Sequence, residues 1–318
     1  MLNRRILRIK AFKELFCFAE NRSMTLKEAL AEYERSCEAV RDLYLFLIGL
    51  IPALTDEMER RQEAARTKFN PTEQERNPNR KLVENALARL FREDPDFSRV
   101  LERKSLSWDN CDAFLGKLCD ALPSKDYYQA YMASPSSSLA EDAALFSRFF
   151  EEELEDNEDL EKILEDLSVY WVDDLDYALI CVSQSLSRVG RSGKWTLPPL
   201  YRSEMLAKEG KTVDNDHLFA TRLLQGAIGE FGRYEALIAD SATRWEKDRI
   251  CTADLCLITL GLAEIEHVPE VPIRVSINEY VDITKFYSTP RSASFVNGLL
   301  DRLVQRLIAD GTIEKSLS

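Results

Sequence analysis

The residue types that carry most enzyme chemistry are few in this sequence. Its two histidines, His217 and His267, lie far apart, and neither has a cysteine or carboxylate at the spacing that zinc ligands use. The seven cysteines form no Cys-x-x-Cys pair. The sequence therefore predicts no zinc or di-metal site and no bound cofactor.

Glycine-rich and nucleophile motifs give no catalytic signal either. The chain contains no Gly-x-Ser-x-Gly turn, no Walker loop and no glycine-rich loop after a strand. Gly226, Gly229 and Gly232 fall inside a helical pattern, where small residues let helices approach closely. Clustered acids over 151–166 could supply paired carboxylates, but a solvated helix face is the commoner use of such a pattern. We predict that the chain is not an enzyme.

Basic residues at the N-terminus could bind an anion. Residues 1–16 carry five Lys and Arg and one acid, whereas residues 151–176 carry 13 acids and one base. Arg8 follows Arg4 by four positions and Arg5 by three, which places all three on one side of a helix. Arginine suits phosphates and base edges because its guanidinium is a planar fork of donors. The formal net charge of −13 does not exclude this role, because phosphate attraction is screened within ~10 Å. A solubilising terminus explains the same composition equally well.

Helical periodicity dominates the elements that must position these residues. Apolar residues over 26–47 recur in steps of four and three, and Thr25 with Glu28 has the spacing of a capping box. Pro52 is expected to end or kink that helix. Residues 255–265 are apolar nearly all round, which predicts the central helix of a bundle.

The remaining signals complete the picture of a helical protein. Ser276 with Glu279 predicts a capped helix start, and Gly311 predicts a C-terminal cap. Trp108 and Phe114 are expected in a core. No stretch shows the two-residue alternation of a strand, so the sequence predicts an all-α protein.

Cysteine usage and hydropathy bear on location. Seven is an odd number of cysteines, and the first residues contain no apolar signal core, which predicts a reducing, cytoplasmic environment. The longest apolar run, over 43–54, is too short to cross a bilayer.

The stretch from Val271 to Asp301 resembles the C-terminal signature of the NusB family of bacterial transcription antitermination factors. The family pattern is approximately Pro-x-x-Val-x-Ile-Asn-Glu-x-Val-x-x-Ala-Lys, then a loop, then Ser-x-x-Phe-Val-Asn-Gly-x-Leu-Asp. The matching residues are Pro272, Val275, Ile277, Asn278, Glu279, Val281, Lys285, Ser292, Phe295, Val296, Asn297, Gly298, Leu300 and Asp301.

Two further stretches are similar to the same family in the same order. The N-terminus resembles its basic opening, Arg-Arg-x-x-Arg-x-x-Ala-x-Gln-x-Leu-Tyr, and residues 219–265 resemble its middle helices. The residues that carry these similarities are Arg4, Arg5, Arg8, Ala11, Leu15 and Phe16, then Trp245, Arg249, Leu262, Ala263, Glu264 and Ile265.

The sequence also departs from the family pattern. Lys13 stands where the family usually has Gln, and Phe16 stands where it has Tyr. Thr284 stands where the family pattern has Ala, directly before Lys285. Arg291 stands where the family often has an acidic residue. Both basic replacements would strengthen attraction to phosphate. Most members of the family are much shorter than this chain.

The resemblance divides the chain into two parts. Residues 1–20 and 216–310 are expected to form the NusB-like RNA-binding domain, and residues 21–215 a helical insertion that includes an acidic helix over 151–176. Because members of the family resemble two stacked three-helix bundles, the implied fold is an all-α, NusB-like helical bundle with an additional helical insertion.

The resemblance also implies a function, that of a transcription antitermination factor. The chain would bind boxA-type single-stranded RNA in nascent rRNA transcripts together with a small-subunit ribosomal protein acting as NusE, within an RNA polymerase antitermination complex. The residues implied in RNA binding are Arg4, Arg5, Arg8, Lys13, Arg291, Ser292 and Phe295. Those implied in contact with the ribosomal protein are Asp248 and Asp254.

Several alternatives stay open at this point. Phe295 could stack on a base or belong to the core, and the two aspartates could be favourable charges at a helix start. A protein-interaction scaffold that kept the bundle but lost RNA binding fits the same resemblance. Some RNA cytosine methyltransferases carry a similar bundle, but the cofactor-binding α/β pattern of those enzymes is missing here. The exact RNA, the role of residues 21–215 and the formation of a homodimer are not decided by the sequence.

Overall fold

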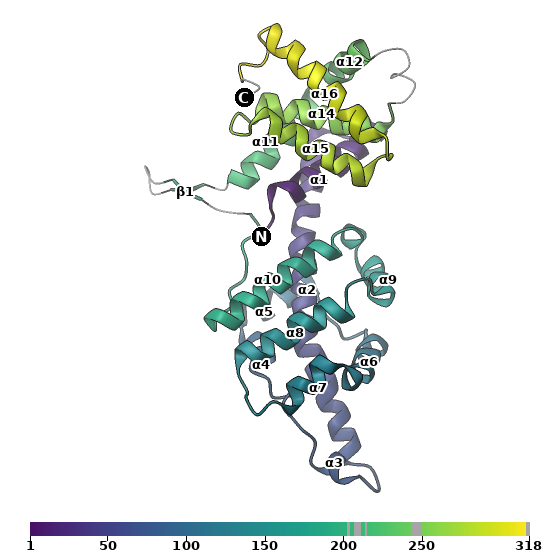
Figure 1. Ribbon diagram of the computed structural model, residues 1–318, viewed down its shortest axis with the longest axis vertical. Coiled ribbons are helices and arrows are strands. Elements are labelled where there is room, and N and C mark those ends of the chain that lie inside the picture. Colours follow the sequence, from purple (N-terminus) through teal and green to yellow (C-terminus); the bar gives the residue numbers. More distant parts are fainter. Residues whose placement is uncertain (202–203, 207–210, 214, 243–249, 316–318) are drawn as a thin grey trace. The chain divides into compact units, whose positions relative to one another are not determined.

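The computed structural model describes residues 1–201, 204–206, 211–213, 215–242 and 250–315. These residues form two compact units (Figure 1). Unit 1 comprises Met1–Cys37 and Pro199–Ser318, and unit 2 comprises Glu38–Pro198. Both are built from helices, which confirms the predicted all-α class.

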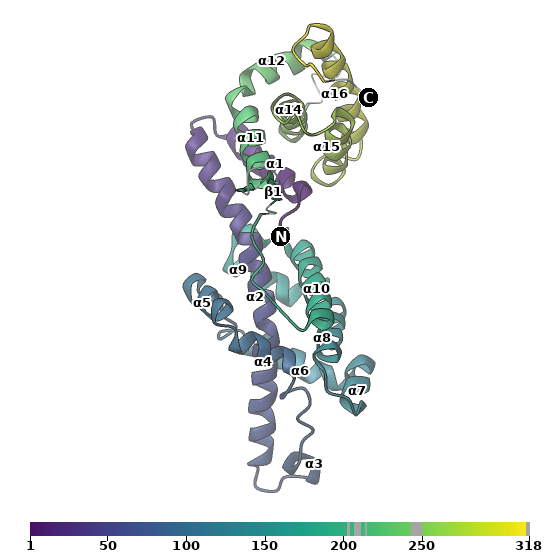
Figure 2. The same cartoon turned by 90° about the vertical axis from the view of Figure 1, so that its left-hand side faces the viewer.

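Unit 1 is a helical bundle around one central helix. Its helices are α1 (Arg4–Glu20), the first turns of α2 (Leu26–Arg66), α11 (Asn215–Gly229), α12 (Phe231–Ser241), α14 (Thr252–His267), α15 (Ile273–Tyr287) and α16 (Ser292–Ala309). Helix α14 contacts α1, α11, α12, α15 and α16. Figure 2 shows α14 nearly end-on, with α11, α12, α15 and α16 around it. Every residue from Cys256 to Ile265 is buried, which confirms the predicted central helix.

Local signals explain several helix ends. The backbone N–H of Thr25 donates to Glu28 at 2.8 Å and the N–H of Glu28 donates back to the Thr25 hydroxyl at 3.3 Å, so the predicted capping box is present. Gly311 follows α16 with a φ of 80°, a left-handed conformation that glycine adopts without strain. Pro52 does not end α2, which continues to Arg66.

One predicted helix start was wrong. Helix α15 begins at Ile273, after the extended residue Pro272, so Ser276 lies inside the helix and caps nothing. Its hydroxyl instead donates to Glu264 in the interior of unit 1. A Ser-x-x-Glu spacing therefore arose here from tertiary contacts and not from capping.

Unit 2 contains the rest of α2 and a series of shorter helices. These are α3 (Glu73–Arg76), α4 (Ala86–Glu93), α5 (Pro95–Lys104), α6 (Asp112–Ala121), α7 (Asp126–Ala133), α8 (Leu139–Glu153), α9 (Glu158–Leu167) and α10 (Leu175–Ser192). Trp108 stacks on Phe46 with ring centroids 4.1 Å apart and donates its indole N–H to the Phe46 carbonyl at 2.8 Å. Phe114 also stacks on the indole, with ring centroids 5.8 Å apart, so the predicted core residues are buried as expected.

Two short features complete the description. Strands β1 (Glu204–Leu206) and β2 (Lys211–Val213) pair antiparallel. The sequence did not predict this small ribbon because three residues are too few to show alternation.

Among the described helices, none combines the length and the apolar character that crossing a bilayer requires.

Candidate nucleic-acid interface

A carboxylate is buried at the centre of unit 1. Glu264, on α14, is completely shielded from solvent and accepts hydrogen bonds from Arg8 Nε at 2.8 Å and from Arg8 Nη2 at 2.7 Å. Ser276 and Tyr280, both on α15, donate their hydroxyl hydrogens to the same carboxylate at 2.8 Å each. A buried charge is tolerated when it is paired and fully hydrogen-bonded, and these four bonds meet that condition.

Arg8 therefore belongs to the interior of unit 1. Its side chain is 5% exposed, and its guanidinium carbon lies 5.1 Å from the centroid of the Phe219 ring. Burial disfavours the charged guanidinium, but its bonds to Glu264 keep the pKa of Arg8 above the ordinary value. The structure thus places Arg8 as the link between α1 and α14, away from the surface that the resemblance implied.

Arg4 faces α11. Its Nε donates to Asp216 at 3.3 Å, and its guanidinium lies 4.9 Å from the centroid of the Phe219 ring. About a third of the side chain remains exposed. Arg4 is accordingly accessible, but it does not lie on the same side of α1 as the basic residues described next.

Arg5 and Lys13 face α15. Arg5 pairs with Asp282 at 3.8 Å, and both side chains are about two-fifths exposed. The ammonium of Lys13 lies 5.7 Å from the centroid of the Tyr287 ring at the end of α15. The predicted common side for the three arginines is therefore divided: Arg8 reaches α15 from inside unit 1, where it pairs with Glu279 at 3.5 Å, and Arg5 and Lys13 reach it with partly exposed side chains.

The turn between α15 and α16 is anchored from beneath by Asp254. This carboxylate is 2% exposed and accepts hydrogen bonds from the hydroxyls of Ser288 at 2.6 Å and Ser292 at 3.0 Å. Ser292 is itself buried, whereas Arg291 beside it is exposed. Asp254 and Ser292 thus hold the turn in place, and Arg291 is the residue that the turn presents to solvent.

An exposed aromatic side chain lies where α15 ends. Phe286 is 77% exposed, follows the exposed Lys285, and lies four residues after Asp282 on the same face of the helix. Phe295, the aromatic residue that the resemblance implied, is half-buried in the first turns of α16. Phe286 was missed because the signature does not specify it. Its position off the buried stripe of α15 was the available signal.

We group four basic residues and one exposed ring as the α1–α15 surface, within which the carboxylate of Asp282 pairs with Arg5 at 3.8 Å and with Lys285 at 2.6 Å. It is formed by two residues of α1, two residues at the end of α15 and one residue of the following turn. They are Arg5, Lys13, Lys285, Phe286 and Arg291.

Two aspartates, Asp248 and Asp254, are implied by the resemblance in contact with the ribosomal protein. Asp248 falls outside the described residues, as do Trp245 and Arg249. Asp254 is described, and its two hydrogen bonds to the α15–α16 turn occupy both of its oxygens. The described part of the chain therefore gives Asp254 a role inside unit 1.

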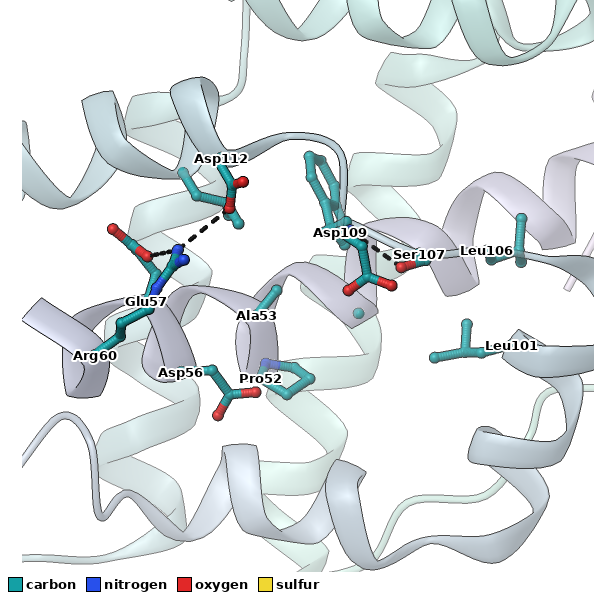
Figure 3. Close-up of a pocket in the computed structure, with 13 residues that line it drawn as sticks. Pro52, Ala53, Asp56, Glu57, Arg60, Leu101, Leu106, Ser107, Asp109 and Asp112 are labelled. Atoms are coloured by element: carbon teal, nitrogen blue, oxygen red, sulfur yellow. Dashed lines mark hydrogen bonds and ion pairs between the residues drawn. The ribbon is translucent and has the colours of Figure 1, made fainter.

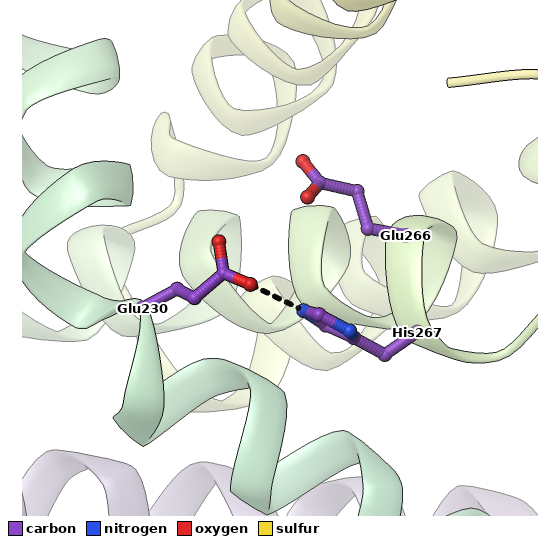
Figure 4. Close-up of side chains that lie close together, drawn as sticks. All are labelled: Glu230, Glu266 and His267. Atoms are coloured by element: carbon purple, nitrogen blue, oxygen red, sulfur yellow. Dashed lines mark ion pairs between the residues drawn. The ribbon is translucent and has the colours of Figure 1, made fainter. Parts of the chain in front are cut away.

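His267 takes part in an ionic cluster at the end of α14 (Figure 4). Its Nε2 lies 3.2 Å from a Glu230 oxygen, and Glu266 brings a further carboxylate within 4.8 Å of these atoms. A nitrogen and two carboxylates could serve a divalent cation. Arg233, however, already pairs with both carboxylates and supplies the positive charge of the cluster. A Cβ at Gly226 would collide with the imidazole, which explains the small residue that the sequence has there.

Unit 2 contains a cavity of about 530 Å³ beside Pro52 (Figure 3). Arg60 pairs there with Glu57 and Asp112, while Asp56 and Asp109 also line the wall. Four carboxylates, those of Asp56, Glu57, Asp109 and Asp112, therefore line the cavity, and the guanidinium of Arg60 neutralises part of their charge.

Comparisons with known proteins converge on one family. The model of the NusB family matches residues 188–305, from the end of α10 into α16, a range that does not include α1. The transcription antitermination protein NusB of Clostridium botulinum (strain Alaska E43 / Type E3) is 36% identical over 105 residues, which are 30% of this chain and 79% of that protein. The NusB proteins of Thermodesulfovibrio yellowstonii and Listeria monocytogenes serotype 4b (strain CLIP80459) are 37% and 34% identical, over 60% and 68% of their lengths and 28% and 27% of this chain. No solved structure gives a significant match.

Proposed function

This chain belongs to the NusB family, and from that premise we propose that it is a non-catalytic transcription antitermination factor of the cytoplasm. In the finer form of the proposal it binds boxA-type single-stranded RNA in nascent rRNA transcripts. It does so together with a small-subunit ribosomal protein that acts as NusE, and the complex associates with RNA polymerase. We place the NusB-like domain in unit 1 and the insertion in unit 2.

The α1–α15 surface is the observation that carries the RNA-binding proposal. Proteins that bind single strands combine basic side chains along the backbone with exposed rings on which bases stack. Lys13, Lys285 and Arg291 supply the positive charge, and the 77% exposed ring of Phe286 is accessible to a base. An exposed ring of this size is otherwise unfavourable, because it leaves apolar surface in water.

Two of the implied RNA contacts receive a different role in this proposal, and a third is reduced. Arg8 and Ser292 are buried, and we assign them to holding α1 and the α15–α16 turn in position. Phe295 is half-buried, so we assign it a smaller share of the contact with RNA than Phe286. We keep Asp248 as the acidic contact for the ribosomal protein, since Asp254 serves the turn.

Binding of a fluorescent boxA-like RNA, with and without the purified ribosomal protein, tests the proposal across a salt series. We expect tight binding that rises with the partner and falls with salt. Replacing Lys13, Lys285 and Arg291 by Ala should weaken binding about 100-fold at low salt and reduce the log–log salt slope by about 2, since each phosphate contact contributes ~0.7. Phe286→Ala should cost about tenfold with an unchanged slope, because stacking is not ionic.

A matched control removes the same charge from unit 2. Arg99, Lys117 and Lys162 are each well exposed, and their joint replacement by Ala should leave RNA binding unchanged. Equal losses in both triple variants would contradict the proposed surface. Binding of the ribosomal protein without any RNA affinity would instead support the scaffold alternative.

A further inference from the structure

Helices α8 and α10 form a groove in unit 2. They lie side by side (Figure 1) and run antiparallel, because the start of α8 meets the end of α10. A Cβ at Gly190 would come within 3.3 Å of the Ala143 Cβ, so the helices are closely packed at that end. At the opposite end they leave a groove of about 440 Å³.

The floor of this groove is apolar and partly open. Phe150 of α8 is buried beneath it, and Leu179 of α10 is half-buried. Ile180 is 54% exposed. The exposed part of Ile180 leaves apolar surface in water between the two helices, and a bound partner would cover it.

The rim of the groove is acidic. Glu151 and Glu155 border it from α8 and the residues that follow, and Asp176 borders it from α10. Asp176 and Ile180 are four residues apart and share one face of α10. No basic side chain lines the groove, and none of the three carboxylates forms an ion pair within the described ranges. Arg148, which lies outside the lining, attracts Glu151 electrostatically, but no side chain of the lining itself offsets the three carboxylates.

Unit 2 as a whole carries a negative net charge, like the rim of the groove. Residues 38–198 contain 20 Lys and Arg and 32 Asp and Glu, a balance of −12 out of −13 for the whole chain. Such a surface repels RNA and other polyanions and attracts cationic segments, which raises their rate of association. The groove therefore fits a basic occupant and excludes a nucleic acid.

We propose that the α8–α10 groove binds a basic amphipathic helix of a partner protein, with an apolar side chain on Ile180 and Lys or Arg side chains on the acidic rim. The face from Asp176 to Ser183 spans about 10 Å, which is enough for two turns of a docked helix. The basic helix of this chain, α1, is not a suitable occupant, because Leu7, Ala11 and Leu15 are already buried in unit 1. This proposal does not depend on RNA binding.

Model peptides test the proposal on the full chain. The probe is a fluorescein-labelled, 14-residue helix of Leu and Lys with Leu along one face, and its companions carry Ser in place of Leu or Glu in place of Lys. We expect micromolar binding of the first peptide, and at least tenfold weaker binding of the other two, because both the apolar anchor and the positive charge are required.

Variants locate the binding on the molecule. Ile180→Ser should weaken the Leu/Lys peptide about fivefold, and Glu151→Lys with Asp176→Lys should weaken it more than tenfold. The matched controls are Val169→Ser, at a side chain that is 78% exposed, and Glu161→Lys with Glu165→Lys on α9, which makes the same charge change. These controls should stay within about twofold of the original chain.

Three results would overturn the proposal. Equal losses in the α9 and groove charge variants would mean general attraction to an acidic surface. Equal binding of the Leu and Ser peptides would mean that Ile180 anchors nothing. Self-association of the chain in sedimentation that Ile180→Ser abolishes would assign the groove to a second copy instead of a basic partner.

Discussion

Replacing Arg8 separates a structural role from a role in RNA binding. Its two hydrogen bonds to Glu264, at 2.8 and 2.7 Å, join side chains that are 5% and 0% exposed. Removing one member of a buried ion pair costs about 3–5 kcal/mol, because the other charge is left in a medium that solvates it poorly. Glu264 would keep the hydroxyls of Ser276 and Tyr280, which places Arg8→Met near the lower end, at about 3 kcal/mol.

Urea denaturation followed by far-UV circular dichroism measures this loss. The double variant Arg8→Met with Glu264→Gln removes both charges and leaves an amide that Ser276 and Tyr280 can still bond. We expect it to be more stable than Arg8→Met alone by about 1–2 kcal/mol, because the fully buried carboxylate is then no longer left without its guanidinium. Arg5→Met is the matched control on the same helix. Its partner is exposed, so it should change stability by less than about 0.5 kcal/mol.

RNA binding provides the second readout. Arg8→Met should weaken RNA binding only together with its loss of stability, because α1 then loses the bond that orients it, whereas Arg5→Met should weaken binding and reduce the salt slope by about 0.7 at unchanged stability. The reasoning fails if Arg8→Met keeps its full stability but loses RNA affinity together with salt dependence. That result would mean that Arg8 leaves Glu264 and contacts phosphate in solution.

Three further predictions concern other buried polar groups. Burial and the nearby charge of Glu32 raise the pKa of Glu14 from 4.5 to about 7. Between pH 4.5 and pH 7 the folded state therefore binds more protons than the unfolded state, and the free energy of unfolding falls as the pH rises through this range. Glu14→Gln should remove that fall and be more stable than the original chain by about 2 kcal/mol at pH 7.5 but not at pH 4.5, as measured by urea denaturation. Asp254→Ala should remove the bonds that join α14 to Ser288 and Ser292, whose hydroxyls would keep only the bonds within the turn. We expect a cost of about 1–3 kcal/mol and weaker RNA binding through the loosened turn; RNA affinity equal to that of the original chain would contradict the anchoring role. Trp108→Phe should keep the stacking on Phe46 but lose the indole bond to its carbonyl, with a cost of about 1–3 kcal/mol in thermal or urea unfolding.

The elements of unit 1 that depend on local signals were predictable from the sequence. The periodic apolar pattern of α14 predicted a central helix, because a helix that is apolar on every side has only other helices as neighbours. Thr25 and Gly311 were correctly identified as caps, since capping depends on residues within one turn.

The roles of polar residues could not be predicted in the same way. The spacing of Arg4, Arg5 and Arg8 predicts nearby positions on one helix, but the distances to Asp216, Asp282 and Glu264 depend on residues more than 200 positions away. The same holds for Ser276, whose true partner is on another helix. Charge and spacing give the chemistry of a side chain, and tertiary contacts decide whether water or RNA can reach it.

The ion pair of Arg8 and Glu264 has a further consequence for the proposed surface. Helix α1 is separated in sequence from α14 by the whole of unit 2, so side-chain contacts between the two helices must align α1 on α14. Apolar packing by itself tolerates small rotations of a helix, whereas a bidentate bond between a guanidinium and a carboxylate is directional. Consecutive residues of a helix differ by about 100° in direction, so an error of one residue would bury Arg5 or Lys13 and expose Arg8. We therefore attribute to this pair the orientation that turns Arg5 and Lys13 toward α15 and builds the α1–α15 surface. If this is correct, the double variant of Arg8 and Glu264 will lose RNA affinity even where it recovers stability.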